Sequence, residues 1–491
     1  MVRRRDGDEI ALLDSSIRTV GGATVSTSLY VLSGLVYVAV TSPAATGTYF
    51  FVAITTALVL RPVRGISQTL QKIGSERGQD VGTYLGVALG FTAVYLLLGG
   101  AVVAVGADEL TRRTVFTAEL LGPGSLYAVA LALSMVVTSL VGAIGYPSAQ
   151  TWLSGAQSAA RLALVVLFAS AIDSTAELLL VGTGVRLALF VPVGLSLGVV
   201  PRRPGRDAVG RAWAFAKWSI PDQILDRFSY NMPVFVLGVV GTPAAVGVYE
   251  AADRFADFGA TIAWRLSSPL LTKVSGDAAT GHDYSAYLDG AVTGGTGVTF
   301  LVCGYLLAAH DVVARVAFAD AQAAFSATVL IVGGVNVFRG FWTLTSHAIE
   351  GLGKPSVSAR TKLYGLAVSV PIPAVFGAEF GAVAGAVGYG VMNLVVFAYV
   401  CYYARDVLGE VPVDVPMAMR LAVGAGVAYG LTTGVIAGVR TSGLSELAVA
   451  VVAAAVSLVG FTGVVLVVST PARVVARRVL ELCAGRVGSV V

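Results

Sequence analysis

The sequence has 491 residues, of which 56% are hydrophobic and only 13% are charged, and its formal net charge is +4. Soluble domains carry about 25% charged residues, so this composition excludes a chain whose apolar side chains are all hidden in one water-soluble core. The small net charge gives no support for a nucleic-acid partner.

Apolar stretches long enough to cross a bilayer recur from Val20 onward with short polar breaks. The predicted spans are 17–40, 47–69, 82–105, 120–144, 150–171, 177–199, 217–240, 246–272, 288–309, 324–350, 360–377, 380–404, 415–438 and 446–469. The chain lacks the alternation of polar and apolar residues that marks barrel strands. The sequence therefore predicts an all-α polytopic membrane protein with about 14 transmembrane helices.

The distribution of Lys and Arg over the loops predicts the orientation of these spans. One set of alternate loops holds most of them: Lys72 and Arg77, Arg202 to Arg211, Lys273, Lys354 and Arg360, Arg405, and Arg473 to Arg486. Since positive residues are retained on the cytoplasmic side, both termini are predicted to be cytoplasmic. The first apolar run has no small-residue cleavage pattern, so we expect it to be a retained span.

An internal repeat divides the chain. The segment Pro43 to Tyr49 (PAATGTY) returns as Pro243 to Tyr249 (PAAVGVY), and Leu70 to Ile73 returns as Leu271 to Val274. Six spans separate the copies, which predicts two lobes in the same orientation, related by an axis along the membrane normal. The predicted organisation is a six-helix lobe at 1–200, a cytoplasmic linker at 201–211, a second six-helix lobe at 212–405, and an appended helix pair with a basic tail at 406–491.

The eighth span carries an unusual set of charges. Glu250, Asp253, Arg254 and Asp257 follow at helical spacing and share one face of a helix. Asp226 and Arg227 reach a similar predicted depth in the seventh span. Charges inside a bilayer cost about 2.5–3.5 kcal/mol each, so they face a cavity or a partner. Two hypotheses follow: the arginines attract an anionic headgroup while the carboxylates couple to ions, or the charges pair with each other.

Further arginines lie in other spans. Arg339, in the tenth span, is a candidate for the cavity wall. Arg18, Arg61 and Arg64 lie near the ends of the first two spans, where lipid phosphates also favour them. Arg161 and Arg186 interrupt the fifth and sixth spans and are candidates for buried ion pairs. Pro221 and Pro233 predict bending of the seventh span.

Motifs for covalent chemistry are missing from the sequence. It has no Walker A glycine-lysine motif and no zinc-binding H-E-x-x-H helix. The three cysteines and the three histidines are isolated from one another. We therefore expect neither an enzyme nor a bound metal or cofactor, and no disulfide framework.

Three segments carry a family resemblance. Pro43 to Tyr49 and Pro243 to Tyr249 look like a "P-x-x-x-G-x-Y" turn, Glu350 to Pro355 (EGLGKP) looks like an "A-L-G-R-P" helix end, and Phe380 to Ala386 (FGAVAGA) is similar to a "G-x-x-G-A-A" segment. On these motifs the chain resembles the Wzx-type polysaccharide and lipid-linked oligosaccharide flippases of the multidrug/oligosaccharidyl-lipid/polysaccharide exporter superfamily.

The resemblance implies two six-helix bundles around a cationic cavity. It implies translocation of a polyprenyl- or dolichol-linked glycan across the cell membrane by alternating access, with membrane lipids and glycan-assembly enzymes as partners. By position, Arg18, Arg227 and Arg254 are the expected phosphate-binding residues, with Arg339 as a further substrate contact.

Other functions remain open at this stage. The carboxylates Asp226, Glu250, Asp253 and Asp257 favour an alternative, an exporter of drugs or metabolites coupled to Na⁺ or H⁺ in the same superfamily. A membrane-embedded transferase would need a catalytic face in a sizeable loop, and the loops here are short. A structural scaffold would not need buried charges at matching depth.

Overall fold

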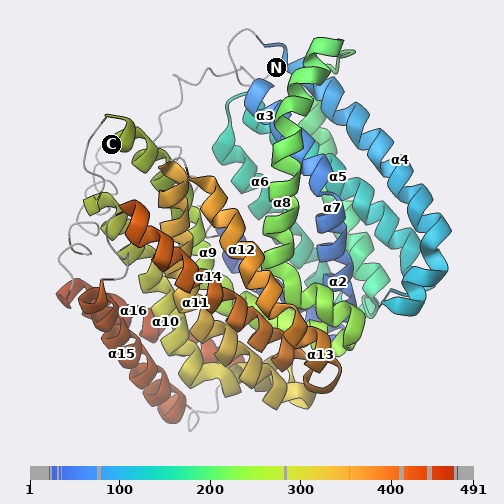
Figure 1. Ribbon diagram of the computed structural model, residues 1–491. Helices are drawn as coiled ribbons and strands as arrows, with labels where there is room; N and C mark the ends of the chain where they lie inside the picture. Colours follow the sequence, from blue (N-terminus) through green and yellow to red (C-terminus); the bar gives the residue numbers. More distant parts are fainter. Residues whose placement is uncertain are drawn as a thin grey trace, which may run out of the picture. The chain divides into compact units, whose positions relative to one another are not determined.

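The computed structural model describes residues 22–473, apart from 23–24, 30–31, 35, 75–78, 115, 281–284, 353, 409–413, 440–444 and 469–472. Regular structure in these residues is helical, and Figure 1 shows the order of the helices. The α-helices are α2 (Pro43–Val59), α3 (Arg61–Gly74), α4 (Val81–Arg113), α5 (Leu121–Ala143), α6 (Pro147–Leu167), α7 (Thr175–Ser196), α8 (Arg206–Val240), α9 (Pro243–Thr280), α10 (Ser285–Ala317), α11 (Gln322–Gly351), α12 (Pro355–Ser369), α13 (Pro371–Phe380), α14 (Ala382–Leu408), α15 (Val415–Val439) and α16 (Glu446–Val468). Short 3₁₀ turns lie at η2 (Ala118–Leu120), η3 (Ala169–Ala171) and η4 (Ala319–Ala321).

The helices match the predicted spans. A helix or a bent helix pair occupies each span from the second to the fourteenth, and residues 25–29, 32–34 and 36–40 of the first are helical. Among the described residues, eight helices are long and apolar enough to cross a membrane, and two bent pairs raise this number to ten. The prediction of an all-α multi-pass membrane protein is confirmed.

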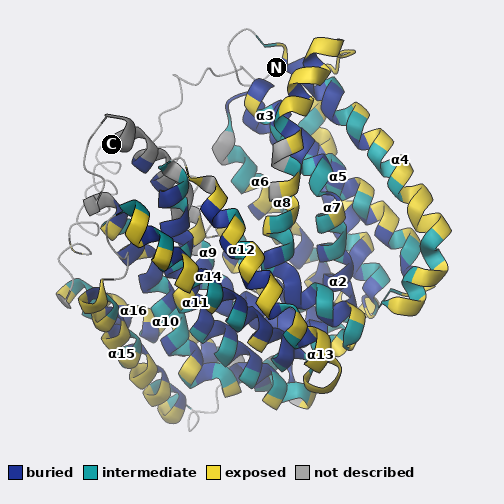
Figure 2. Cartoon of the chain, in the orientation of Figure 1, coloured by how far each residue is buried: buried dark blue, intermediate teal, exposed yellow. Residues whose placement is uncertain are grey.

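The surface of these helices suits lipid. Figure 2 shows that the outer face of α4 is exposed along most of its length. This face presents apolar side chains, with Leu97 75% exposed and Val105 91% exposed. Apolar side chains on a helix that faces water would be unfavourable, but lipid tails are as apolar as leucine.

Two of the predicted spans are bent helix pairs. The span predicted at 47–69 consists of α2 and α3, which meet at an angle of 54°, and the span predicted at 360–377 consists of α12 and α13, which meet at 41°. Pro62 and Pro371 lie at these breaks. Proline has no N–H to donate and clashes with the carbonyl four residues earlier, so the helix bends there.

The described chain divides into two compact units. The first contains Met1–Ala251 and Pro373–Gly385, and the second contains Ala252–Ile372 and Ala386–Val491. In the first unit, α3 packs against α4, α5 and α8 around Leu70. The predicted six-helix lobes at 1–200 and 212–405 stay a prediction.

The last two helices, predicted as an appended pair, pack against α10 in the second unit. The contact is close, because a Cβ on Gly304 would lie 2.4 Å from the backbone oxygen of Ala425. Tyr305 also donates a hydrogen bond of 3.2 Å to the backbone oxygen of Ala450. The pair α15 and α16 is therefore an integral part of the second unit.

The stretch predicted as a linker at 201–211 becomes helical at Arg206, where α8 begins. Its extended part is held against the start of α4, where the N–H of Arg202 donates a hydrogen bond of 2.9 Å to the oxygen of Gly82. The Arg202 side chain also lies 3.4 Å from the Asp80 carboxylate. This half of the predicted linker is thus anchored to α4.

Both copies of the repeated motif begin a helix in the same way. Ser42 Oγ accepts a hydrogen bond of 3.1 Å from the N–H of Ala45, and Thr242 Oγ1 accepts one of 3.2 Å from the N–H of Ala245. In each copy a proline follows the capping residue, at the first helical position, where its missing N–H has no intrahelical role.

The two copies also pack against each other. A Cβ on Gly47 would lie 1.8 Å from the backbone oxygen of Pro243, and a Cβ on Gly247 would lie 2.1 Å from the backbone oxygen of Pro43. The contact is reciprocal, as expected where equivalent segments meet across a pseudo-two-fold axis. The backbone oxygen of each proline therefore leaves no room for a side chain at the glycine of the other motif.

We predict that Gly47→Ala destabilises the protein by about 2–3 kcal/mol, since the methyl group overlaps the Pro243 carbonyl and the backbones must separate. Thermal unfolding of the protein in detergent measures the change. Gly100→Ala in α4 is the matched control, because no atom lies within 4 Å of the added methyl group. Equal melting temperatures for the two variants would contradict the close packing.

Candidate functional site

The charged face of α9 is buried. Glu250 is 2% exposed, and Asp253, Arg254 and Asp257 are 5–6% exposed. The helix is continuous from Pro243 to Thr280, so the spacing predicted from sequence places the four side chains on one face. Each residue of this set is thus enclosed by protein and not by lipid.

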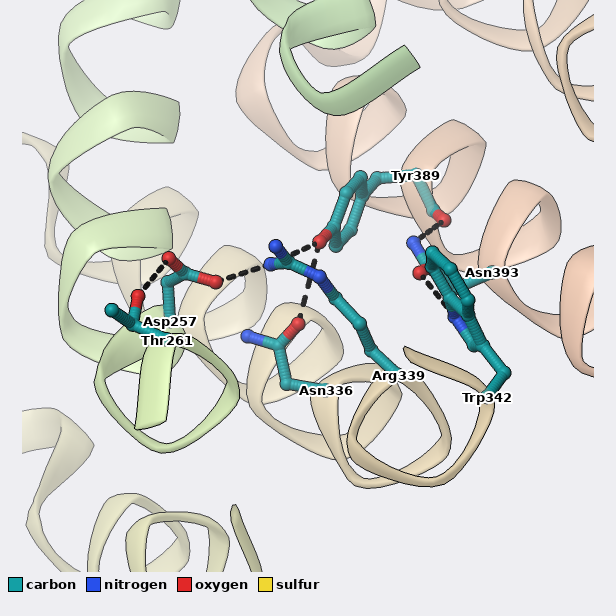
Figure 3. Close-up of polar contacts among 7 residues, drawn as sticks. All are labelled: Asp257, Thr261, Asn336, Arg339, Trp342, Tyr389 and Asn393. Carbon is teal, nitrogen blue, oxygen red and sulfur yellow. Dashed lines mark hydrogen bonds and ion pairs between the residues drawn. The ribbon is translucent and has the colours of Figure 1, made fainter. Parts of the chain in front are cut away.

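Asp257 forms an ion pair with Arg339 of α11 in the second unit (Figure 3). One carboxylate oxygen accepts from Arg339 Nη1, and the other accepts a hydrogen bond of 2.8 Å from Thr261 Oγ1, one turn further along α9. The Asp257 and Arg339 side chains are 7% and 11% exposed. A buried pair of this kind requires additional hydrogen bonds to offset desolvation, and Thr261 supplies one of them.

The network continues from Arg339 to α14. Arg339 Nη1 also donates to Tyr389 Oη at 2.9 Å, and Tyr389 donates to Asn336 Oδ1 at 3.4 Å. On the same helices, Trp342 Nε1 donates to Asn393 Oδ1 at 3.1 Å (Figure 3). Since polar groups in low dielectric are costly unless they are satisfied, this network joins α9, α11 and α14.

The carboxylate and the guanidinium of this pair cancel each other's charge. Arg339 was predicted to contact substrate, and Asp257 to take part in ion coupling. The ion pair joins two helices, as in the second hypothesis from the sequence, but its arginine lies on α11, outside the charges of the seventh and eighth spans that this hypothesis named. Their roles in transport stay untested, but the pair presents no net charge to a ligand.

A second group of polar side chains lies on α3 and α8 in the first unit. The bend after Leu60 places Arg61 in the first turn of α3, where its Nη1 donates a hydrogen bond of 3.0 Å to Gln223 Oε1 of α8. Arg61 lies within electrostatic range of Arg64, Asp226 and Arg227. We call Arg61, Arg64 and Arg227 the α3–α8 cluster.

The kink in α8 lies next to this cluster. Asn231 leaves helical geometry, with φ −107° and ψ 16°, two residues before Pro233. Its side-chain Nδ2 donates a hydrogen bond of 2.9 Å to the backbone oxygen of Arg227. The bending predicted for this span is confirmed at Pro233, and the asparagine amide satisfies a carbonyl at the bend.

The α3–α8 cluster is cationic and has unused donors. None of its three arginines forms an ion pair with a carboxylate of the described residues. The Nε atoms of Arg61 and Arg227 are buried without a hydrogen-bond acceptor among these residues. Arginine does not lose its proton in proteins, so the cluster keeps its positive charge and can receive an anion.

The structure places the sequence candidates in different ways. Arg18 lies outside the described residues. Asp226 and Arg227 lie beside Arg61, and Asp257 forms an ion pair with Arg339. Glu250, Asp253 and Arg254 share the buried face of α9.

The sequence interpretation did not include Arg61 and Arg64 among the site residues. Pro62 was the available signal, since a break at that residue brings Arg61 to α8.

Comparison of structures identifies the fold. A lipid II flippase, MurJ, in an inward closed conformation superposes with a TM-score of 0.71 at 11% sequence identity, covering 93% of this chain and 98% of that protein. An outward-facing MATE multidrug resistance transporter of the MOP superfamily gives 0.54 at 15% identity, covering 80% and 94%. A MOP superfamily transporter from Pyrococcus furiosus, with a binding pocket of reversed polarity, gives 0.55 at 15% identity, covering 80% and 95%.

The chain has the fold of MurJ and the MATE transporters. The fold implied by the sequence resemblance is therefore confirmed over most of the chain. These neighbours are a flippase and transporters. The sequence matches no protein-family model, and no curated protein is similar to it in sequence.

We predict that Asp257→Asn lowers the free energy of unfolding by about 3–5 kcal/mol, because it leaves the Arg339 charge buried without its carboxylate. The double variant Asp257→Asn/Arg339→Gln should recover much of this loss, since neither charge remains.

Thermal or denaturant unfolding of the purified protein measures both variants. Glu109→Gln is the control, because it removes a carboxylate from an exposed ion pair. In that pair the Glu109 side chain is 51% exposed and the Arg113 side chain is 77% exposed. This control should change stability by less than about 1 kcal/mol. Additive losses in the double variant would contradict a coupled pair.

Proposed function

We propose that this protein is a flippase that translocates a lipid-linked oligosaccharide or polysaccharide precursor across the cell membrane by alternating access. Carrier-linked glycans bear a phosphate or pyrophosphate between lipid and sugar, so their headgroup is anionic. The observation that carries the proposal is the α3–α8 cluster, in which Arg61, Arg64 and Arg227 keep their charge without a paired carboxylate among the described residues.

The chemistry of the cluster fits such a headgroup. Guanidinium groups present several N–H donors in a planar fork that matches phosphate oxygens, and charge-assisted hydrogen bonds are about twice as strong as neutral ones. The buried Nε donors of Arg61 and Arg227 are available for these bonds. Arg254, enclosed on α9, is a further candidate contact from the sequence resemblance.

The remaining parts of the proposal rest on sequence and fold. A protein that shares this fold along 98% of its length is a lipid II flippase, whose substrate is likewise lipid-linked. The distribution of Lys and Arg over the loops supports a cytoplasmic location of both termini. In this scheme the two lobes rock against each other, and glycan-assembly enzymes supply the substrate from the cytoplasmic side.

The alternative is a cation-coupled exporter of drugs or metabolites. The buried carboxylates on α9 and the similarity of fold to a multidrug resistance transporter favour it. Asp257 contributes less to this reading, because its charge is already matched by Arg339. An exporter of cationic drugs would also be opposed by the three arginines of the α3–α8 cluster.

We predict that a strain lacking the gene accumulates a carrier-linked glycan on the cytoplasmic face and loses surface glycan. The wild-type gene should restore the surface glycan. The double variant Arg61→Gln/Arg227→Gln should restore it at a rate lower by roughly tenfold or more, because each charge-assisted hydrogen bond contributes about 1.5–3 kcal/mol. Lipid-linked glycans and surface glycan are measured in strains matched for expression.

Arg113→Gln is the control arginine, because Arg113 lies at the exposed end of α4 and pairs with Glu109. It should restore the surface glycan like the wild type. If the deletion leaves all glycans unchanged and instead raises drug retention, the exporter is the better assignment. Equal restoration by both variants would remove the α3–α8 cluster from the site.

A further inference from the structure

A separate group of arginines and tyrosines is buried in the first unit. It comprises Tyr37, Tyr49 of α2, Tyr127 of α5, Arg161 of α6 and Arg186 of α7. The three tyrosines are 1–3% exposed, and both arginines are 8% exposed. We call this group the tyrosine–arginine cluster. None of its members belongs to the α3–α8 cluster.

Tyr49 lies at the centre of this group. Its hydroxyl accepts a short hydrogen bond of 2.6 Å from Arg161 Nη1, and it lies within electrostatic range of Arg186, Tyr37 and Tyr127. Its ring packs edge-on against Tyr37 with a centroid distance of 5.5 Å. The two guanidinium groups therefore converge on one set of phenols.

The arginines are also held over aromatic faces. The Arg161 guanidinium lies 5.4 Å from the ring centroid of Tyr37, and that of Arg186 lies 4.7 Å from the ring centroid of Tyr127. Cation–π contacts of this kind are worth about 0.5–2 kcal/mol, far less than the desolvation of a guanidinium. The Tyr127 ring therefore offsets only part of the Arg186 charge.

Arg186 has few polar contacts besides the Tyr127 ring. Among the described residues its one hydrogen bond is a long contact of 3.5 Å from Nη1 to the Gly182 oxygen in the preceding turn of α7, and its Nε is buried without an acceptor. No carboxylate of the described residues lies within ion-pair distance of Arg186, although the sequence predicted such a partner. Arginine keeps its proton, so the charge persists.

A second donor in the cluster is also unused. The Tyr37 hydroxyl is buried and has no hydrogen-bond partner among the described residues. Tyr37 and Arg186 Nε thus offer O–H and N–H groups that lack an acceptor. Buried donors normally find one, because an unsatisfied group costs about 1–3 kcal/mol and more when it is charged.

We propose that the tyrosine–arginine cluster binds a small inorganic anion of single charge, with chloride as the physiological occupant. An anion supplies both the missing counter-charge for Arg186 and an acceptor for the two donors. The enclosure of all five side chains excludes a lipid headgroup, and the positive charge excludes Na⁺ or another cation. The anion acts as an integral part of the first unit, apart from the proposed substrate contacts on α3 and α8.

The wild-type protein, purified in detergent, tests the proposal through its melting temperature. Chloride is exchanged at constant ionic strength for gluconate, a larger organic anion. We expect the melting temperature to rise with the logarithm of chloride concentration once the site begins to fill, because a ligand that binds only the folded state stabilises it. Bromide should act like chloride. Identical melting in chloride and gluconate would overturn the proposal.

Two variants locate the site. Tyr37→Phe keeps the ring and removes the donor, so it should raise the apparent halide dissociation constant by about fivefold to tenfold, the equivalent of one hydrogen bond. Arg186→Gln should abolish the halide response. Arg113→Gln, an exposed arginine, is the matched control and should respond like the wild type. A full response in Arg186→Gln would place the anion elsewhere.

A measurement without variants covers the case in which Arg186→Gln does not fold. Bromide-soaked crystals of the wild-type protein should give an anomalous peak within hydrogen-bonding distance of Arg186 and Tyr37. Crystals that diffract well and lack a peak at this position would overturn the assignment. This outcome leaves the proposed flippase activity unaffected, because glycan accumulation in the deletion strain is a separate measurement.

Discussion

A guanidinium group keeps its charge inside a membrane, and this constraint governs where the arginines of this chain lie and what surrounds them. The arginines of this chain make three kinds of contact that stabilise the charge. Arg339 pairs with the Asp257 carboxylate, Arg186 lies over the Tyr127 ring, and Arg61 bonds to the Gln223 amide. The Asp257 carboxylate neutralises Arg339, whereas the Tyr127 ring and the Gln223 amide leave the charges of Arg186 and Arg61 in place.

The bends of the helices follow from the same environment. A helix in lipid must satisfy its backbone internally, so a break is tolerated only where other protein groups replace the lost hydrogen bonds. At the kink in α8, the Asn231 amide bonds to the Arg227 carbonyl, and at the break between α2 and α3 the chain enters a new helix within one residue. Each bend positions a residue of the α3–α8 cluster.

The distribution of charge between the two units bears on the proposed function. The second unit contains a neutral pair, Asp257 with Arg339, and the first contains the cationic α3–α8 cluster. The α3–α8 cluster therefore attracts an anionic headgroup more strongly than the neutral pair does. The repeated motif brings the helix starts at Gly47 and Gly247 into close backbone contact.

The sequence alone determined the fold class, nearly all of the helix positions and the repeat, because these depend on local hydropathy, on helical spacing and on short motifs such as the one that begins at Pro43. It also showed that Glu250 to Asp257 share a face of one helix. Which charges pair was decided by the tertiary structure. Arg61 and Gln223 are 162 residues apart, and Arg339 and Asp257 are 82 residues apart, so no local pattern joins them. Their pairing depends on the angles at which bent helices pack, which side-chain contacts between distant segments set.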